Sequence, residues 1–140
     1  MNHPPLGLVV IDDNALALDA LERWLSSGAD LRWLGGASHP DKALALISEK
    51  HPDIVLLDVD MPGVDTFALL DQIGALHPGV KVVMFSGFVR SDYVERALAA
   101  GASGYVIKDE PFATTIDFLR RAAEGECVLS NAAAAAFMQG

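Results

Sequence analysis

The sequence predicts an α/β protein in which helices cover both faces of one doubly wound parallel sheet, and two observations carry this prediction. Five short apolar runs alternate with segments whose apolar residues recur at helical spacing. The apolar runs lack polar alternation, which is typical of strands buried on both faces of a sheet. Strands that alternate with helices pair in parallel through right-handed crossovers, so we expect a five-stranded parallel sheet between two layers of helices.

The first two strand–helix units occupy the N-terminal third of the chain. The run Leu6–Ile11 is expected as a strand that ends at Asp12. The helix that follows has an apolar stripe of Leu18, Leu21 and Leu25. The run Leu31–Leu34 is expected as the second strand. Its helix is expected to end at His51-Pro52, because the residue before a proline disfavours helical geometry.

The remaining three units follow the same pattern. Their strands are expected at residues 54–57, 80–85 and 105–107. Each strand is followed by a helix with its own apolar stripe, and these stripes include Phe67, Leu70 and Ile73, then Val94, Ala97 and Leu98, then Phe112, Ile116 and Leu119. Five such units account for nearly all of the 140 residues, which is the length of one ordinary domain.

Composition narrows the class of protein. Ten Lys and Arg against nineteen Asp and Glu give a net charge of −9. Affinity for nucleic acid comes mainly from basic residues that replace counterions, so we expect no DNA binding by this chain alone. Cys127 is the single cysteine and cannot form an internal disulfide, which favours a reducing cytosol. No apolar run approaches the length of a membrane span, so we expect a cytoplasmic protein without membrane contact.

Polar side chains follow four of the five expected strands. Asp12 and Asp13 follow the first strand, and Asp58 follows the third. Ser86 follows the fourth strand and Lys108 the fifth. Ligands of an open parallel sheet bind beyond the carboxyl ends of its strands, where the strand order reverses. We therefore expect these five side chains to face one site.

The chemistry of these side chains points to phosphoryl transfer. Three clustered carboxylates repel one another, and a bound divalent cation relieves the repulsion. Mg²⁺ prefers oxygen ligands and is often held by one or two carboxylates plus a phosphate. A lysine and a hydroxyl are suitable donors to phosphoryl oxygens, and an aspartate can accept the phosphoryl group as a nucleophile. The set predicts a Mg²⁺-dependent phosphoacceptor site with Asp58 as the acceptor.

Each of these residues alone also has an ordinary structural explanation. Asp12-Asp13-Asn14 before a helix is typical of a helix cap. Ser86 is typical of a turn and Lys108 of a solvated surface charge. Their occurrence together at the ends of four expected strands favours a shared site over these separate explanations.

The motifs around these residues resemble a response-regulator receiver domain of two-component signalling. The motifs are Asp12-Asp13, Leu56–Gly63, Met84–Gly87 and Gly101–Lys108, and the resemblance covers residues 6–126. It implies a flavodoxin-like (CheY-like) fold with strand order 2-1-3-4-5. Residues 104–109 and 125–130 are more specifically similar to transcription regulators of the NarL/LuxR type.

The resemblance implies a role for each carboxylate. Asp58 would take a phosphoryl group from a sensor histidine kinase and form an aspartyl phosphate. Mg²⁺ would be ligated by Asp13, Asp58 and the backbone carbonyl of Asp60, with Asp12 assisting through water. Such a domain catalyses only its own phosphorylation and dephosphorylation, so we do not expect an enzyme with an external substrate.

The resemblance also implies a switch. Ser86 and Lys108 would hold the phosphoryl oxygens. Ser86 and Tyr105 would form the switch pair, in which the hydroxyl is drawn inward and the ring rotates toward the vacated space. The domain would act as a phosphoprotein whose altered surface controls an output domain or a partner, with dimerisation on phosphorylation as one route.

Three residues depart from the family pattern. Thr66 stands where the family usually has a glycine, and a tighter loop after Asp58 is expected. Asp60 places an extra carboxylate two residues past the acceptor, and the sequence leaves open whether it slows or speeds attack by water. Asp109 follows Lys108 in place of a common proline, so a trans peptide is expected there.

The domain boundaries and the alternatives follow from the same motifs. We expect a receiver at residues 1–126 and a tail or linker helix at 127–140, capped by Ser130 or Asn131. The tail favours a connector, and the resemblance to NarL/LuxR-type regulators implies that the receiver continues into a helix-turn-helix DNA-binding domain absent from this chain. The alternatives are a stand-alone receiver that acts by protein contact, a pseudo-receiver that never sees phosphate, and a haloacid-dehalogenase-type phosphatase.

Overall fold

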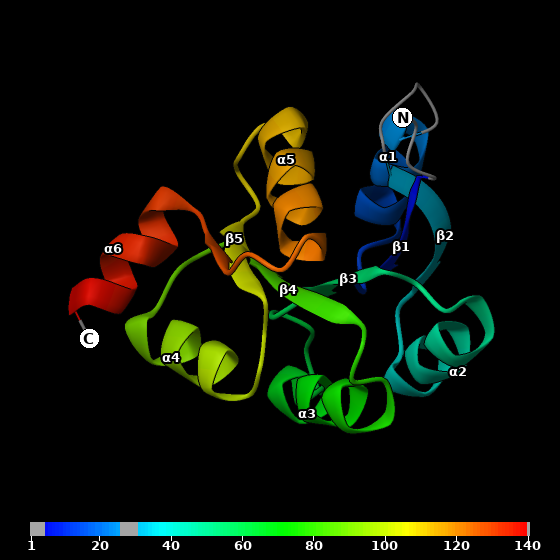
Figure 1. Cartoon of the computed structure of the whole chain (residues 1–140), viewed down its shortest axis with the longest axis horizontal. Helices are drawn as coiled ribbons and strands as arrows, with labels where there is room; N and C mark the ends of the chain where they lie inside the picture. The colour runs from blue at the N-terminus through cyan, green and yellow to red at the C-terminus, as the bar shows by residue number, and fades with distance from the viewer. Residues whose placement is uncertain (1–4, 26–30, 140) are drawn as a thin grey trace.

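A six-stranded parallel sheet with helices on both faces forms the centre of the molecule in this computed structural model, which describes residues 5–25 and 31–139 (Figure 1). The strand order is β2-β1-β3-β4-β5-β6, and every neighbouring pair is parallel. The predicted order 2-1-3-4-5 is confirmed, and the structure adds a sixth strand beside β5. None of the described helices is long and apolar enough to cross a membrane.

The bounds of the elements agree closely with the apolar runs of the sequence. The strands are β1 Leu6–Ile11, β2 Leu31–Ala37, β3 Ile54–Asp58, β4 Lys81–Ser86, β5 Gly104–Ile107 and β6 Val128–Leu129. The helices are α1 Ala15–Leu25, α2 Pro40–Lys50, α3 Thr66–Leu76, α4 Ser91–Ala99, α5 Phe112–Ala123 and α6 Asn131–Gln139. The end expected for the second strand at Leu34 is wrong, because β2 continues to Ala37.

Two glycines explain why β2 is longer than expected. The register between β1 and β2 shifts opposite Leu34, and pairing resumes at Gly35 and Gly36. A Cβ atom at Gly36 would lie 3.0 Å from Leu18 of α1, and one at Gly35 would lie 3.0 Å from Leu46 of α2. The glycines therefore leave room for both helices to pack close to the last residues of β2.

Two apolar cores lie on opposite faces of the sheet. On one face, α1 and α5 pack on the strands, with Leu21 and Leu119 among the buried side chains. On the other face, α2, α3 and α4 form the layer, and Ile47 and Ile73 are fully buried. The strands contribute alternate residues to the two cores, which is why their runs show no polar position.

The C-terminal segment is joined to the sheet. β6 pairs with β5 through Gly104–Val128 and Tyr105–Leu129, and the Ser130 amide donates to the Tyr105 carbonyl at 3.1 Å. Ser130 also accepts from the Ala133 amide at 3.4 Å and thereby caps α6. α6 packs beside α4 at this end of the sheet, as Figure 1 shows at the left of the view.

Candidate functional site

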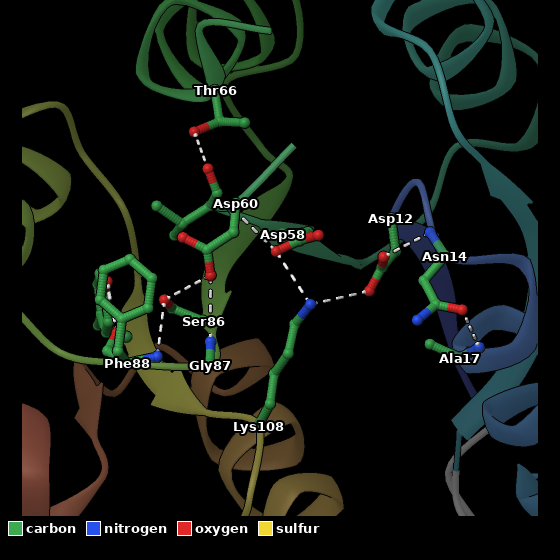
Figure 2. Close-up of polar contacts among 12 residues, drawn as sticks. Asp12, Asn14, Ala17, Asp58, Asp60, Thr66, Ser86, Gly87, Phe88 and Lys108 are labelled. Carbon is green, nitrogen blue, oxygen red and sulfur yellow. Dashed lines mark hydrogen bonds and ion pairs between the residues drawn. The ribbon is translucent and has the colours of Figure 1, made fainter. Parts of the chain in front are cut away.

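The carboxyl ends of β1, β3, β4 and β5 meet at one edge of the sheet. Asp58 is the last residue of β3, and Ser86 is the last residue of β4. Asp12 directly follows β1, and Lys108 directly follows β5. These four strands are neighbours, so their ends bring the predicted side chains close together (Figure 2).

Three carboxylates form the acidic part of the site. Asp12, Asp13 and Asp58 each offer an oxygen, and these oxygens lie within 4.8 Å of one another. Asp12 and Asp58 are each only 1% exposed, whereas Asp13 is exposed. Carboxylate oxygens at this separation, with one open to solvent, fit a hard divalent cation such as Mg²⁺.

Within the sequence Asp12-Asp13-Asn14, the residue that caps a helix is Asn14. Asn14 caps α1, because its side-chain oxygen accepts from the amides of Leu16 and Ala17 at 3.0 and 3.2 Å. Asp12 accepts from the Asn14 amide at 2.9 Å with one oxygen, and its other oxygen faces Lys108. The Asp12 carboxylate therefore belongs to the site.

Lys108 connects two of the carboxylates. Its Nζ lies 3.1 Å from Asp58 Oδ1 and 3.3 Å from Asp12 Oδ2. Burial alone would lower the pKa of Lys108, but the hydrogen bond to Asp58 and the charges of Asp12 and Asp58 raise it above its ordinary value. The ammonium is therefore charged at neutral pH and offsets part of the carboxylate repulsion.

Asp58 titrates unusually for an aspartate. Burial raises its pKa from 3.8 to about 6, and the negative charge of Asp12 acts in the same direction. The Asp60 amide, which donates to Asp58 Oδ1 at 2.9 Å, and the Lys108 ammonium both lower the pKa of Asp58. A carboxylate nucleophile must be ionised, so these donors keep Asp58 reactive at neutral pH.

Ser86 lies in a second group of contacts, centred on the Asp60 side chain. The Ser86 hydroxyl donates to Asp60 Oδ2 at 2.9 Å, and the Gly87 amide donates to the same oxygen at 3.2 Å. The Phe88 amide donates to Ser86 Oγ at 3.3 Å. The sequence indicated an extra carboxylate at Asp60 but not these contacts. The Gly87 amide is likewise a donor that the residue types did not reveal.

Tyr105 is buried behind this group. Its side chain is fully buried, and its hydroxyl donates to the Phe88 carbonyl at 3.5 Å. Burial raises the pKa of Tyr105, while the Ser86 hydroxyl lowers it. The predicted switch pair thus lies side by side, with the ring already inside the core.

The loop after Asp58 is held at both ends. The Thr66 hydroxyl is buried and donates to the Val59 carbonyl at 3.1 Å, a contact that glycine could not make. Asp65 caps α3 by accepting from the Ala68 amide at 3.0 Å. The peptide bond between Lys108 and Asp109 is trans, as expected. The ligand role of the Asp60 backbone carbonyl stays a prediction.

The fold and this arrangement of side chains define a class of protein. The chain belongs to the response regulator receiver domain family, whose family model matches residues 8–120. This match confirms the resemblance and gives no support to the phosphatase alternative.

Within this family, the chain is similar to regulators of the NarL and LuxR type. It is 32% identical to the nitrate/nitrite response regulator protein NarL of Escherichia coli K12 over 131 residues, which are 94% of this chain and 61% of NarL. It is 30% identical over 135 residues to the transcriptional regulatory protein YxjL of Bacillus subtilis, which it covers to 62%. The chain therefore spans about three fifths of the length of these relatives.

Solved structures agree with this assignment. The signal receiver domain of NarL from Mycobacterium tuberculosis is 28% identical, with a TM-score of 0.81 over 89% of this chain and 100% of that domain. A LuxR-family response regulator from Aurantimonas sp. SI85-9A1 has a TM-score of 0.88 at 22% identity, over 96% of each chain. At 22% identity, the similarity to the Aurantimonas protein shows the fold alone.

Proposed function

We propose that this receiver is phosphorylated on Asp58 by a sensor histidine kinase in a Mg²⁺-dependent reaction. The observation that carries the proposal is the position of Asp58, which is buried at the end of β3, 3.1 Å from Lys108 and within 4.8 Å of two further carboxylates. Asp13, Asp58 and the Asp60 backbone carbonyl are the proposed ligands, with Asp12 assisting. When bound, Mg²⁺ supplies positive charge that offsets repulsion between the carboxylates and the phosphoryl oxygens.

The chain's own residues prepare the nucleophile. A carboxylate oxygen of Asp58 forms a bond to phosphorus as the bond from phosphorus to the kinase's histidine nitrogen breaks, and the imidazole leaves. The Lys108 ammonium contacts Asp58 Oδ1, and the Asp60 amide donates to the same oxygen. These contacts orient the carboxylate and leave the ammonium beside the incoming phosphoryl group.

The proposed response passes through Ser86 and Tyr105. Ser86 is fully buried at the end of β4, within reach of the same edge of the sheet as Asp58. The Tyr105 hydroxyl and the Ser86 hydroxyl both contact the Phe88 backbone. A phosphoryl group that recruits the Ser86 hydroxyl would therefore disturb the contacts of Tyr105 directly.

We further propose that the phosphorylated receiver controls transcription in the cytoplasm through a DNA-binding output domain, with dimerisation as one route. The similarity to longer regulators of the NarL type supports this proposal. The alternative is a stand-alone receiver that acts by protein contact.

Intact-mass spectrometry after incubation with Mg²⁺ and acetyl phosphate tests the phosphoacceptor proposal. We expect the wild-type chain to gain one phosphoryl mass and Asp58→Asn to gain none. Asp71→Asn, which changes an exposed carboxylate on α3, should be labelled like the wild type. Labelling of Asp58→Asn at the wild-type rate would overturn the assignment of the acceptor. A wild-type chain that is never labelled would favour the pseudo-receiver.

A further inference from the structure

The Asp60 side chain holds the hydrogen-bond donors at the end of β4. We propose that Asp60 is a positioning residue whose carboxylate competes with the Asp58 phosphoryl group for the Ser86 hydroxyl and the Gly87 amide. Phosphorylation must then displace Asp60 before Ser86 can respond. The inference rests on the proposed function, because it concerns the same phosphoryl group.

The hydrogen-bond capacity of Ser86 makes the competition direct. A serine hydroxyl has a single hydrogen to donate, and in Ser86 it goes to Asp60 Oδ2 at 2.9 Å. The Phe88 amide already donates to Ser86 Oγ, so the hydroxyl is engaged as donor and as acceptor. Ser86 therefore cannot donate to a phosphoryl oxygen while this contact persists.

The backbone keeps Asp60 beside the acceptor. The Asp60 amide donates to Asp58 Oδ1 at 2.9 Å, while Thr66 holds the preceding carbonyl of Val59. Two donors, from Ser86 and Gly87, converge on one oxygen of the Asp60 carboxylate (Figure 2). This oxygen occupies the place at these donors that a phosphoryl oxygen would take.

The exposure of Asp60 makes the contact reversible. Its side chain is half-buried, whereas Ser86 is fully buried. Asp60 can therefore turn toward solvent without disturbing the core. Hydrogen bonds to a charged acceptor are stronger than neutral ones, so the displacement carries a measurable cost in phosphoryl affinity.

Binding of beryllofluoride, a mimic of the phosphoryl group on aspartate, tests this proposal. Calorimetry at saturating Mg²⁺ should give Asp60→Ala an affinity about tenfold higher than wild type, because one charge-assisted contact no longer has to be broken. Asp60→Asn keeps an acceptor oxygen without the charge and should lie between them. Asp109→Asn removes one charge from the exposed residue after Lys108 and should change the affinity less than about twofold.

A Ser86→Ala background separates competition from simple charge repulsion. Without the hydroxyl, Asp60→Ala should raise beryllofluoride affinity much less than it does beside an intact Ser86. An equal gain in both backgrounds would overturn the competition for the Ser86 hydroxyl, because the effect would then not pass through Ser86.

Acetyl phosphate labelling of the same variants keeps the two proposals distinguishable. If the wild type and Asp60→Ala bind beryllofluoride equally and both are labelled, the phosphoacceptor function stands and the role of Asp60 is wrong. If none of the variants takes beryllofluoride or a phosphoryl group, both proposals fail together.

Discussion

Lys108 is the cation beside Asp58 and Asp12, and we expect these two carboxylates to have different roles. Asp58 is the proposed nucleophile, whereas Asp12 is buried and held by the Asn14 amide. A single ammonium within 3.3 Å of both carboxylates reduces their mutual repulsion. The same charge, however, opposes a second cation nearby. We therefore expect Lys108 to favour binding of the phosphoryl group and to disfavour binding of the metal.

Replacement of Lys108 separates these two effects. In Lys108→Ala we expect Mg²⁺ affinity to be retained or increased, because a positive charge near the carboxylates is lost. Labelling by acetyl phosphate should slow by about tenfold or more, because one charge-assisted contact to the phosphoryl oxygens is missing. Parallel Mg²⁺ titrations of Asp13→Ala provide the comparison. A loss of Mg²⁺ affinity as severe as that of Asp13→Ala would contradict this division of roles.

The raised pKa of Asp58 predicts a pH dependence of stability. The folded chain binds this proton more tightly than the unfolded chain, since the pKa is about 6 rather than 3.8. The resulting contribution to stability is fully present below the pKa of Asp58 in the unfolded chain. It is lost as pH rises through the pKa of Asp58 in the folded chain. Without Mg²⁺, the free energy of unfolding in urea should therefore decrease between about pH 4 and pH 7. Asp58→Asn should remove this pH-dependent part of the free energy of unfolding. If the free energy of unfolding of that variant depends on pH as in the wild type, the assignment to Asp58 is refuted.

At the scale of single residues, sequence reasoning located side chains better than their partners. Asp12 and Lys108 directly follow buried strands and Asp58 ends one, so their position at the sheet edge could be predicted from the ends of apolar runs. The contact between Asp60 and Ser86 could not, because it depends on how the loop after β3 bends toward the end of β4. Such a bend is set by Thr66 and the Asp60 amide, through contacts that have no periodic signal.

At the scale of elements, glycine decides how close two segments approach. A Cβ atom at Gly104 would meet the Val128 carbonyl oxygen and side chain of β6. The backbones of β5 and β6 can therefore pair only because residue 104 has no side chain. Gly74, in contrast, is exposed in the last turn of α3, and a Cβ atom added there would meet open space.

These two glycines predict alanine substitutions of opposite sign. Gly104→Ala should lower the free energy of unfolding by about 1–3 kcal/mol, because the added methyl group forces β6 away from β5. Gly74→Ala should raise it by about 0.5–1 kcal/mol, because alanine favours the helix. Chemical unfolding of both variants checks the pair. A neutral Gly104→Ala would mean that β6 separates from β5 at little cost.

The strands that carry long apolar runs were predictable, and the short or irregular ones were not. β3 is buried along its length, and β1 and β4 are buried after their first residue; such runs have few other interpretations. β6 contains two residues, which is too short for any periodicity. The end of β2 contains two glycines, a residue type that is depleted in strands, so the sequence did not indicate a strand there. The packing of these glycines against α1 and α2 explains why they occur in β2.

At the scale of the whole molecule, folding concentrates negative charge that the unfolded chain spreads out. The net charge is −9, and three carboxylates share one edge of the sheet. Self-repulsion of this kind opposes the compact state. A cation that binds only the folded chain therefore acts on stability as well as on function.

Mg²⁺ should raise the thermal midpoint of unfolding. A ligand of the native state alone adds about 2.7 kcal/mol at a hundredfold excess over its Kd. Asp13→Ala should lose most of this gain, because the exposed Asp13 is a proposed ligand. Scanning calorimetry with and without millimolar Mg²⁺ measures both. A thermal midpoint of the wild-type chain that does not change with Mg²⁺ would argue against the metal site.

The pairing of β6 with β5 also determines how this protein behaves when it is shortened. β6 covers the backbone groups of β5, whose side chains at Tyr105 and Val106 are fully buried. A fragment that stops at residue 126 would present β5 as an unprotected edge, with free amides and carbonyls beside an apolar surface. Such edges recruit strands from other molecules, so the fragment should self-associate at concentrations where the 140-residue chain stays dispersed. We therefore expect solubility to depend on two residues, Val128 and Leu129, that lie far along the chain from the proposed phosphoacceptor.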